Sequence, residues 1–321
     1  MRRAFEILRL LSDGGLHSGE DLAVSLGITR AAVWNQIRRL RAEGLSIIAT
    51  KGVGYKLSCQ FEALDSAEIE RHLQQQGCYL FQCRVEDVID STNTRLLLQS
   101  VKSDIHGQAL FAEFQTTGRG RRGDKWVSPP GSGICFSLGY VFDTPPATFS
   151  ALSLVVGISM IEALEKIGVR GIKVKWPNDI VRGEEKVAGI LIEMRAEASG
   201  ASRTVIGIGL NFVLPEKVVK LVDRPIGALE THVTDKFTRN QVAAIILHVL
   251  SVNLLRFETF GFAAFHDDWR NFDVLSGRNI RLELGTREVK GVSRGVDENG
   301  ALLLDTNSGL ESFLSGHLTV V

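Results

Sequence analysis

Arginine and glycine crowd one short segment of the chain, Gly118-Arg119-Gly120-Arg121-Arg122-Gly123. Glycine lets backbone N–H groups turn toward an anion, and arginine adds forked donors that fit a carboxylate or a phosphate. Further along, Lys175-Trp176-Pro177-Asn178-Asp179 places a lysine at the end of an expected strand, beside a Pro-Asn-Asp turn. Alone, the first segment also fits an exposed turn. Together, the two segments predict a site that binds a phosphorylated, carboxylate-bearing ligand.

Three further segments place polar or small residues at expected helix and strand ends. Asp90-Ser91-Thr92-Asn93 precedes a helix, where plain N-capping is the simpler interpretation, although a helix N-terminus also attracts polar ligand groups. Lys186-Val187-Ala188-Gly189-Ile190 puts a lysine at a turn, where it also fits an exposed hairpin position. Gly207-Ile208-Gly209-Leu210-Asn211 allows a ligand to approach a strand closely, but its spacing is not that of a dinucleotide-binding loop. The chain has neither a P-loop nor a GxSxG nucleophile elbow.

The elements that must position these segments alternate between strands and helices from about residue 78 to 272. Five short apolar runs predict strands, at 109–112, 134–138, 172–175, 188–192 and 204–208. Two long apolar stretches predict helices, at 149–167 and 239–257. This order predicts a mixed α/β layer arrangement with a substantial core. From about residue 276 the pieces are short and strand-like with glycine turns between them, which predicts a small β-barrel.

The first part of the chain, to about residue 58, predicts a helix, a turn, further helices and a hairpin. Ser18 and Thr29 are expected to begin two of these helices as N-caps, and apolar residues share one face of each helix. Strands at 47–50 and 55–57 flank a glycine turn at 51–54. This is the order of elements in a winged helix-turn-helix. A connecting helix is expected at about residues 60 to 75.

The last helix of this N-terminal part has the residue types that contact DNA. Arginine and asparagine bind base edges and phosphates, and small residues allow close approach to the groove. The candidate DNA-binding residues are Thr29, Arg30, Ala31, Trp34, Asn35, Arg38, Lys51 and Lys56. Residues 1–60 hold nine Lys/Arg against five Asp/Glu, or +4; because the chain holds 37 of each, the remainder holds 28 against 32, or −4. The alternative is a solvated helix pair that docks against its own body.

Composition and cysteine usage narrow the class of protein. Hydrophobic residues make up 44% of the 321 residues, which is enough for large cores. The four cysteines, Cys59, Cys78, Cys83 and Cys135, form no CxxC pair and none lies near a histidine at metal spacing, so no resident metal site is expected. The apolar runs fall far short of the ~20 residues of a membrane helix, and no signal peptide is apparent. We therefore expect a cytoplasmic protein with reduced thiols and no membrane partner.

Set together, these segments resemble the biotin protein ligases, in whose order and spacing 118–123, 175–179, 186–191 and 207–211 occur. The resemblance covers the whole chain and implies an α+β multidomain fold. Its parts are a winged helix-turn-helix at 1–60, a central mixed α/β catalytic domain of the class II synthetase-like biotin/lipoate ligase type at 61–272, and a C-terminal SH3-like β-barrel at 273–321. The bifunctional members of the family are also repressors of the biotin operon.

The resemblance implies two half-reactions. The carboxylate of biotin attacks the α-phosphate of ATP bound with Mg²⁺, which gives biotinyl-5′-AMP and pyrophosphate. A lysine of a biotin carboxyl carrier protein, that of acetyl-CoA carboxylase, then attacks the mixed anhydride and releases AMP. ATP, Mg²⁺ and biotin are therefore the implied cofactors, and biotinyl-5′-AMP is the implied corepressor. The adenylate favours a homodimer that binds a palindromic operator, through a surface that the acceptor domain also uses.

Residue by residue, the resemblance implies three sets of site residues. The implied biotin-binding residues are Ser91, Thr92, Asn93, Gln115, Arg119, Gly120, Arg121, Lys186, Gly189, Gly207 and Gly209. The implied nucleotide-binding residues are Arg121, Arg122, Trp126, Lys175, Asn178, Asn211 and Ile226. The implied catalytic residues are Arg121 and Lys186, beside the acyl phosphate, and Asp179, which would orient the acceptor amine. Trp126 would also anchor the C-terminal end of the glycine–arginine segment 118–123, here called the arginine loop.

One departure from the family pattern affects the adenine pocket. Some repressor-type members place a tryptophan against the adenine after the GxGxN strand, but the four tryptophans here are Trp34, Trp126, Trp176 and Trp269. Ile226 is the expected replacement, so adenine packing and ligand-linked dimerisation should differ in strength.

Two alternative functions remain open. A lipoate ligase shares the fold and the adenylation chemistry, although the arginine loop and Trp176 favour biotin. A ligand-sensing transcription factor without ligase activity is the second alternative, and the intact basic residues Arg121, Lys175 and Lys186 argue against it.

Overall fold

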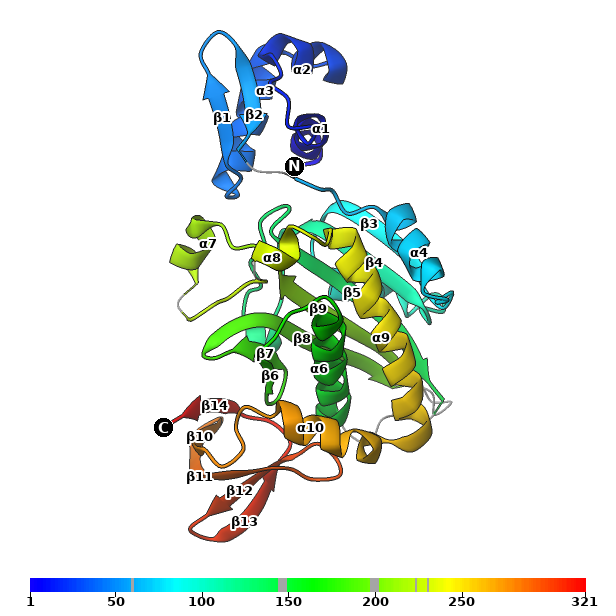
Figure 1. The fold of residues 1–321 in the computed structure, drawn as a ribbon, viewed down its shortest axis with the longest axis vertical. Coiled ribbons are helices and arrows are strands. Elements are labelled where there is room, and N and C mark those ends of the chain that lie inside the picture. Colours follow the sequence, from blue (N-terminus) through cyan, green and yellow to red (C-terminus); the bar gives the residue numbers. More distant parts are fainter. Residues whose placement is uncertain (59–60, 144–148, 197–201, 223, 230) are drawn as a thin grey trace.

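The computed structural model describes residues 1–58, 61–143, 149–196, 202–222, 224–229 and 231–321. Three bodies follow one another along the long axis of the molecule, in the order of the chain (Figure 1). The small N-terminal body is at one end, the mixed α/β body is in the middle, and the all-β C-terminal body is at the other end.

The N-terminal body is a winged helix-turn-helix, as the sequence predicts. Its elements are α1 (Arg2–Leu11), α2 (Gly19–Leu26), α3 (Arg30–Ala42), β1 (Ile47–Thr50) and β2 (Gly54–Leu57). The side chains of Ser18 and Thr29 accept hydrogen bonds from Asp21 N and Ala32 N, so both predicted N-caps are present. Gly27 ends α2 at φ 61°, a left-handed conformation in which glycine costs least.

A seven-stranded sheet forms the middle of the molecule, in the order β3-β4-β5-β9-β8-β7-β6. Its strands are β3 (Gln82–Ile89), β4 (Gln108–Gln115), β5 (Gly133–Phe142), β6 (Ile172–Lys175), β7 (Asp179–Arg182), β8 (Glu185–Ala196) and β9 (Ser202–Asn211). Only the β3–β4 pair is parallel; the other pairs are antiparallel. Two strands were not predicted from the sequence: β3, an edge strand whose charged residues break up its apolar pattern, and the four-residue strand β7.

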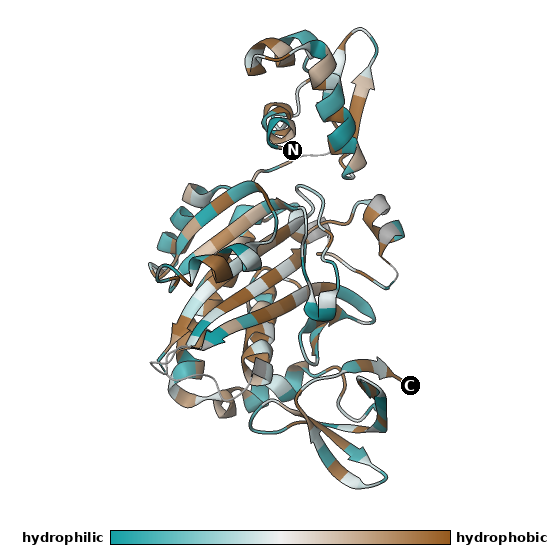
Figure 2. Cartoon of the chain, turned by 180° about the vertical axis from the view of Figure 1, so that it is seen from behind, coloured by the Kyte–Doolittle hydropathy of each residue, from teal (hydrophilic) through white to brown (hydrophobic). Residues whose placement is uncertain are grey.

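Helices cover the two faces of this sheet. α4 (Ser66–Gln75), α6 (Phe149–Lys166) and α9 (Arg239–Phe260) lie over one face, and α5 (Thr92–Gln99) packs on the other. The two-residue period of β4 divides its side chains accordingly, because Phe111 joins the core under α6 and α9 while Leu110 joins the cluster under α5. Seen from behind, the strands carry apolar and polar segments in turn (Figure 2).

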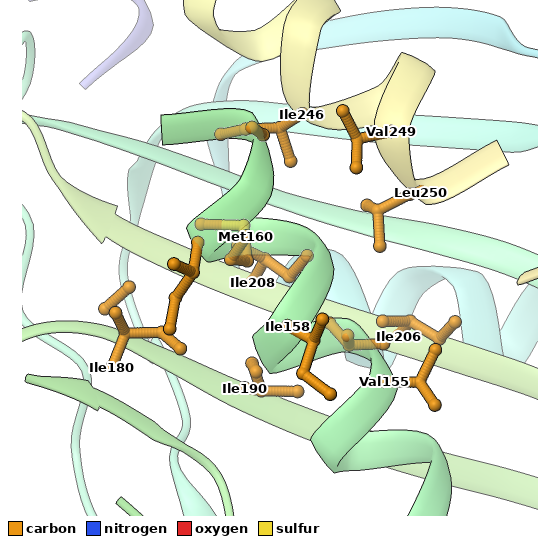
Figure 3. Packing of buried hydrophobic residues seen from close by; sticks show 14 of the residues in the cluster. Val155, Ile158, Met160, Ile180, Ile190, Ile206, Ile208, Ile246, Val249 and Leu250 are labelled. Atoms are coloured by element: carbon orange, nitrogen blue, oxygen red, sulfur yellow. The ribbon is translucent and has the colours of Figure 1, made fainter. Parts of the chain in front are cut away.

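The main core lies between α6, α9 and the sheet (Figure 3). α6 presents Val155, Ile158 and Met160, which pack with the strand residues Ile190, Ile206 and Ile208 and with Ile246, Val249 and Leu250 of α9. Because α6 is apolar on every side, its sequence is a long hydrophobic stretch without a polar face.

α9 corrects the expectation that no apolar run approaches the length of a membrane span. It has 22 residues, and an 18-residue window within it has a mean hydropathy of 1.5, although 56% of that window is buried within the protein. Its first residue, Arg239, forms a buried ion pair with Glu113 of β4 at 3.0 Å. Burial against α6 and the sheet makes α9 a core helix.

Short helical segments complete the middle of the molecule. They are η1 (Arg121–Gly123), α7 (Glu216–Leu221), α8 (Thr231–Thr234), η2 (Phe262–Phe265) and α10 (His266–Phe272).

The C-terminal body is one antiparallel sheet in the order β13-β12-β11-β10-β14. Its strands are β10 (Asn279–Leu284), β11 (Arg287–Val296), β12 (Leu302–Thr306), β13 (Gly309–Phe313) and β14 (His317–Val320). Its inner side chains, among them Ile280 and Leu304, belong to the same apolar cluster as the central core. Trp176 also joins the two bodies, because its Nε1 donates to the backbone oxygen of Gly300 at 3.1 Å.

The exact domain boundaries at 60/61 and 272/273 stay predictions. Phe61 packs with the N-terminal apolar cluster, and Leu275 packs with the central one.

Candidate active site

A cavity of about 480 Å³ opens where the ends of β4, β7, β8 and β9 meet the arginine loop. All of the ligand-binding residues predicted from the sequence line this cavity, except Asn211 and Ile226. Residues 119–122 of the glycine–arginine segment and residues 175–179 lie on its walls together with the N-terminus of α5. The fold therefore brings segments more than 80 residues apart in the chain into one site.

The floor of the cavity is a set of hydrogen-bonded polar side chains at the N-terminus of α5. Thr92 and Asn93 are each 3% exposed, and the Thr92 hydroxyl lies 2.7 Å from the hydroxyl of Ser137 of β5, within hydrogen-bond distance. The side-chain oxygen of Gln115 accepts from Thr92 N at 2.9 Å. Ser91 caps the helix through a hydrogen bond from Thr94 N, so capping and cavity lining coincide. Ser137 was missed, although a lone serine in the apolar run Ile-Cys-Phe-Ser-Leu was the available signal.

The amide of Asn93 is fixed by the protein. Its nitrogen donates to Leu191 O at 3.1 Å and to a carboxylate oxygen of Glu193 at 2.9 Å, and its oxygen accepts from the Ser137 hydroxyl at 2.5 Å. A Cβ atom on Gly207 would lie 2.2 Å from the Asn93 side-chain oxygen. Glycine at position 207 therefore makes room for a side chain of the protein, and not directly for a ligand ring.

Trp126 occupies the second glycine position in the same way. A Cβ atom on Gly209 would lie 2.4 Å from the indole, and one on Gly189 would lie 3.1 Å from it. The backbone N–H of Trp126 donates to Gly118 O at 3.0 Å, so Trp126 also holds the exit of the arginine loop. The indole forms a flat apolar wall of the cavity over the sheet.

The arginine loop closes on itself and reaches two walls of the cavity. Gly120 N donates to Asp124 O at 2.7 Å, and Arg122 adopts φ 55°, which is uncommon for a residue with a side chain. Arg121 donates to the Asn178 side-chain oxygen at 3.3 Å. Burial lowers the pKa of Arg121, and the nearby charge of Arg122 lowers it further while Asp179 opposes both effects. A poorly solvated guanidinium is thus held at the rim, ready for an anion.

Lys186 and Asp179 form an ion pair beside this guanidinium. The ammonium nitrogen lies 2.5 Å from Asp179 Oδ1, and the two side chains are 13% and 26% exposed. Burial lowers the pKa of Lys186, and Asp179 counteracts part of that shift. The Lys186 nitrogen also lies 5.8 Å from the centre of the Trp126 ring. This placement excludes the alternative of an exposed hairpin lysine.

Asn178, Asn211 and Ile226 brace the walls of the cavity. Asn178 lines it and donates to Ile190 O at 2.8 Å. Asn211 donates to Lys186 O at 3.2 Å and to Gly227 O at 2.9 Å, and Ile226 pairs its backbone with Lys186. Arg224 and Pro225, just before Ile226, line the cavity there and Ile226 itself does not, so the contact of Ile226 with adenine stays a prediction.

The C-terminal body completes the cavity with residues that the sequence analysis did not single out. Five consecutive residues of this wall belong to β14 or directly precede it, and they are Gly316, His317, Leu318, Thr319 and Val320. Nothing in their local pattern marks them, because they reach the cavity only through the packing of the barrel on the central body.

The predicted DNA-binding residues lie at the other end of the molecule from the C-terminal body. All eight of them are exposed, on α3, at its N-cap or on the hairpin. The guanidinium of Arg38 lies over the Trp34 ring, 4.7 Å from its centre, and Trp34 is 49% exposed. An exposed indole and clustered cations are suited to binding a nucleic acid.

Within the described ranges, no group of three or more His, Cys, Asp or Glu residues is arranged to hold a metal ion. Cys78, Cys83 and Cys135 are free and buried, and burial raises the pKa of Cys83 to about 12. Cys59 lies outside the described residues.

Three family models match successive parts of the chain. They describe an HTH domain over residues 3–56, the biotin/lipoate A/B protein ligase family over 85–211, and the biotin protein ligase C terminal domain over 275–317. Fold and site together define a biotin protein ligase that carries its own helix-turn-helix.

Relatives match the chain from end to end. It is 36% identical to the bifunctional ligase/repressor BirA of Salmonella typhimurium, over 98% of this chain and 96% of that protein, and 35% identical to that of Escherichia coli over the same shares. The chain therefore belongs to the family of bifunctional ligase/repressors. Among solved structures, the biotin protein ligase from Aquifex aeolicus in complex with biotin and ATP is 30% identical, with a TM-score of 0.62 over 74% of this chain and 98% of that one.

Proposed function

We propose that this protein activates biotin with ATP to form biotinyl-5′-AMP and transfers the biotinyl group to a lysine of a biotin carboxyl carrier protein. The observation that carries this proposal is the composition of one cavity. Its floor is built from fixed, neutral hydrogen-bonding groups, and its rim carries Arg121, Lys175 and Lys186. A ligand with a neutral polar head and an anionic reacting end fits both parts.

The floor suits the ureido ring of biotin, which donates and accepts hydrogen bonds. Ser91, Thr92 and Gln115 offer hydroxyl and amide groups, and Asn93 offers its carbonyl oxygen because its amide nitrogen is bonded to Leu191 and Glu193. Groups that the protein already holds in position lose little freedom when the ligand binds.

The rim suits attack of a carboxylate on a phosphate. No protein nucleophile is required, because the substrate carboxylate attacks; the protein has to align the two groups, neutralise charge and exclude water. Arg121 and Lys186 are partly desolvated cations, so they attract an anion more strongly than exposed ones would. Arg122, Lys175 and Asn178 line the adjoining wall, where we place the phosphates and the nucleotide, with Trp126 as an apolar surface. Mg²⁺ enters with ATP as part of the substrate and neutralises the leaving pyrophosphate.

The second half-reaction needs a neutral lysine amine at the mixed anhydride. Asp179 lies in the cavity next to Lys186, and we assign to it the role of orienting that amine. Asp179→Asn should lower the rate of transfer from preformed biotinyl-5′-AMP by about 10²-fold while the Lys186 side chain stays in place. Single-turnover transfer to a carrier domain measures this rate, and an unchanged rate would remove Asp179 from the mechanism.

The N-terminal body supports a second activity, repression of transcription with biotinyl-5′-AMP as corepressor. The exposed set on α3 and the hairpin would contact DNA, and a homodimer formed by the adenylate-bound protein would place two such bodies on a palindromic operator. Helix α9 is explained by core packing, and we propose a cytoplasmic location.

Both alternatives give different results in one experiment. The protein is incubated with a carrier domain, ATP, Mg²⁺ and either biotin or lipoate, and the carrier is weighed by mass spectrometry. A mass increase with biotin alone supports the proposal, an increase with lipoate indicates a lipoate ligase, and no increase with either indicates a sensor without ligase activity. A mobility shift on operator DNA, with and without biotin and ATP, tests repression.

A further inference from the structure

Glu193 of β8 joins the arginine loop to the floor of the cavity. One of its carboxylate oxygens accepts a short hydrogen bond from Arg119 of the loop, and the other accepts from the Asn93 amide at 2.9 Å. A second guanidinium nitrogen of Arg119 donates to the Thr94 hydroxyl of α5 at 3.1 Å. The carboxylate of Glu193 on β8 therefore binds both helix α5, through Asn93, and the arginine loop, through Arg119.

These contacts change the interpretation of Arg119. The family resemblance implied that Arg119 contacts biotin, and two of its guanidinium nitrogens are bonded to protein groups, on Glu193 and Thr94. The residue still lines the cavity. Its bonds run across the end of the cavity where Asn93 lies, so they hold the loop down over that end.

We propose that Glu193 is a positioning residue that latches the arginine loop closed over the head-group end of the cavity. The identity of the ligand rests on the proposed function, whereas the latch itself rests on the contacts of the protein. The ion pair is only partly buried, with side-chain exposures of 42% for Arg119 and 24% for Glu193. Ion pairs of that exposure are individually weak, which suits a contact that opens for substrate and closes again.

The same carboxylate also couples the loop to the floor. When the latch is formed, Glu193 holds the Asn93 amide so that its nitrogen faces Glu193 and Leu191 and its oxygen faces Ser137. When the contact between Arg119 and Glu193 is broken, the Glu193 side chain is free to move away from the Asn93 amide. Closing of the loop and orientation of a head-group contact are therefore linked through one side chain.

Glu193→Gln separates the two roles. The carboxamide keeps one oxygen acceptor, which suffices for Asn93, but it presents an NH₂ group and no charge to Arg119. Glu193→Asp keeps the charge at shorter reach. Glu288→Gln is the matched control, because Glu288 forms exposed ion pairs with Arg281 and Lys290 on the C-terminal sheet, and none of these three residues lines the cavity.

Two measurements on the full-length protein test the latch. The first is tryptic cleavage of the loop without ligand, since 119–125 contains four trypsin sites, Arg119, Arg121, Arg122 and Lys125. The second is the dissociation rate of bound biotin and of biotinyl-5′-AMP. Glu193→Gln should speed both by about tenfold, raise KM for biotin by a similar factor and leave kcat within about twofold. Glu193→Asp should restore part of the effect, and Glu288→Gln should show none.

The outcomes are distinct. The latch is overturned if Glu193→Gln leaves both the tryptic lifetime and the dissociation rates at wild-type values, or if Glu288→Gln changes them equally. It is also overturned if the loss in Glu193→Gln adds fully to that of Arg119→Ala, because two halves of one contact should not be additive. Wild-type protein that binds no biotin would refute the proposed function, and the ligand-free tryptic test would still decide the latch.

Discussion

At the scale of single residues, the glycines of the cavity serve the side chains of the protein. Gly207 and Gly209 of β9 read in the sequence as places where a ligand approaches the strand. The structure fills these places with Asn93 and Trp126, and it is these two side chains that line the cavity. The sequence located the positions correctly, but it could not say which neighbour needs the space.

Gly207→Ala should therefore weaken biotin binding indirectly. The added methyl group would meet the Asn93 side-chain oxygen at 2.2 Å and displace the amide group from its hydrogen-bond partners Ser137 and Leu191. We expect at least a tenfold rise in the dissociation constant for biotin, about 1.4 kcal/mol, measured by titration calorimetry.

Gly139→Ala is the matched control for this substitution. Gly139 lies on β5 of the same sheet, outside the cavity, and its methyl group would meet Ile105 O at 2.2 Å. It should lower thermal stability as Gly207→Ala does and leave the biotin affinity of the folded protein unchanged. Equal affinity losses in both variants would mean that general disruption of the sheet, and not Asn93, is responsible.

At the scale of elements, the join between α10 and the C-terminal sheet contains a buried acid. Asp273 ends α10, its backbone bridges to Val174 of β6, and its carboxylate accepts from Leu275 N at 2.8 Å. Burial raises the pKa of Asp273 to about 6, although the hydrogen bond from Leu275 and the charge of Lys173 act in the opposite direction. The join is therefore less stable when this carboxylate is ionised.

The raised pKa of Asp273 makes the stability of the protein depend on pH. Between the ordinary pKa of 3.8 and about 6 the folded protein binds more protons at Asp273 than the unfolded chain does, so the free energy of unfolding falls as pH rises through this range. Asp273→Asn should remove this loss and raise the free energy of unfolding at pH 7.5 by about 1–3 kcal/mol, with a much smaller gain near pH 4.

Urea denaturation of wild type and variant at the two pH values measures the effect. Asp267→Asn, an acid on the same helix that is 90% exposed, is the control and should show no such pH-dependent difference. A gain for Asp273→Asn that is equal at both pH values would assign the effect to packing instead.

The sequence predicted the elements whose pattern is local. Short stretches of sequence suffice to predict three features. These are the long apolar helices, the winged helix-turn-helix with its caps at Ser18 and Thr29, and the arginine loop. It did not predict Glu193, Ser137 or the β14 wall, because each acquires its role from a partner far away in the chain. Arg119 lines the cavity, but its protein partners were not foreseen, and its contact with biotin stays a prediction.

At the scale of the whole molecule, the N-terminal body rests on the same strands that lead into the cavity. Val88 of β3 and Phe114 of β4 pack against the N-terminal apolar cluster, and Arg9 pairs with Asp87 at 2.7 Å. Gln115, the residue after Phe114, is already part of the cavity floor. The face that would bind DNA lies on other elements of that body, α3 and the hairpin, so the two activities should be separable by substitution.

Arg30→Ala tests this separation. Arg30 is exposed at the first position of α3, far along the chain from any residue of the cavity. Its loss should weaken operator binding by about 1–3 kcal/mol in a mobility shift, while biotin transfer to the carrier stays at the wild-type rate. A parallel fall in transfer would show that the two bodies depend on each other more closely than their contacts indicate.

The positions of the four tryptophans give the molecule an optical readout of each end. Trp269 is buried at 3% exposure and does not line the cavity, so its emission should stay constant, whereas Trp126 and Trp176 line the cavity and Trp34 is exposed on α3. Replacing Trp34 with phenylalanine would leave the two cavity indoles to sense an arriving vitamin, and replacing those two would leave Trp34 to sense the duplex. Stopped-flow fluorescence could then time the two encounters separately in unlabelled protein.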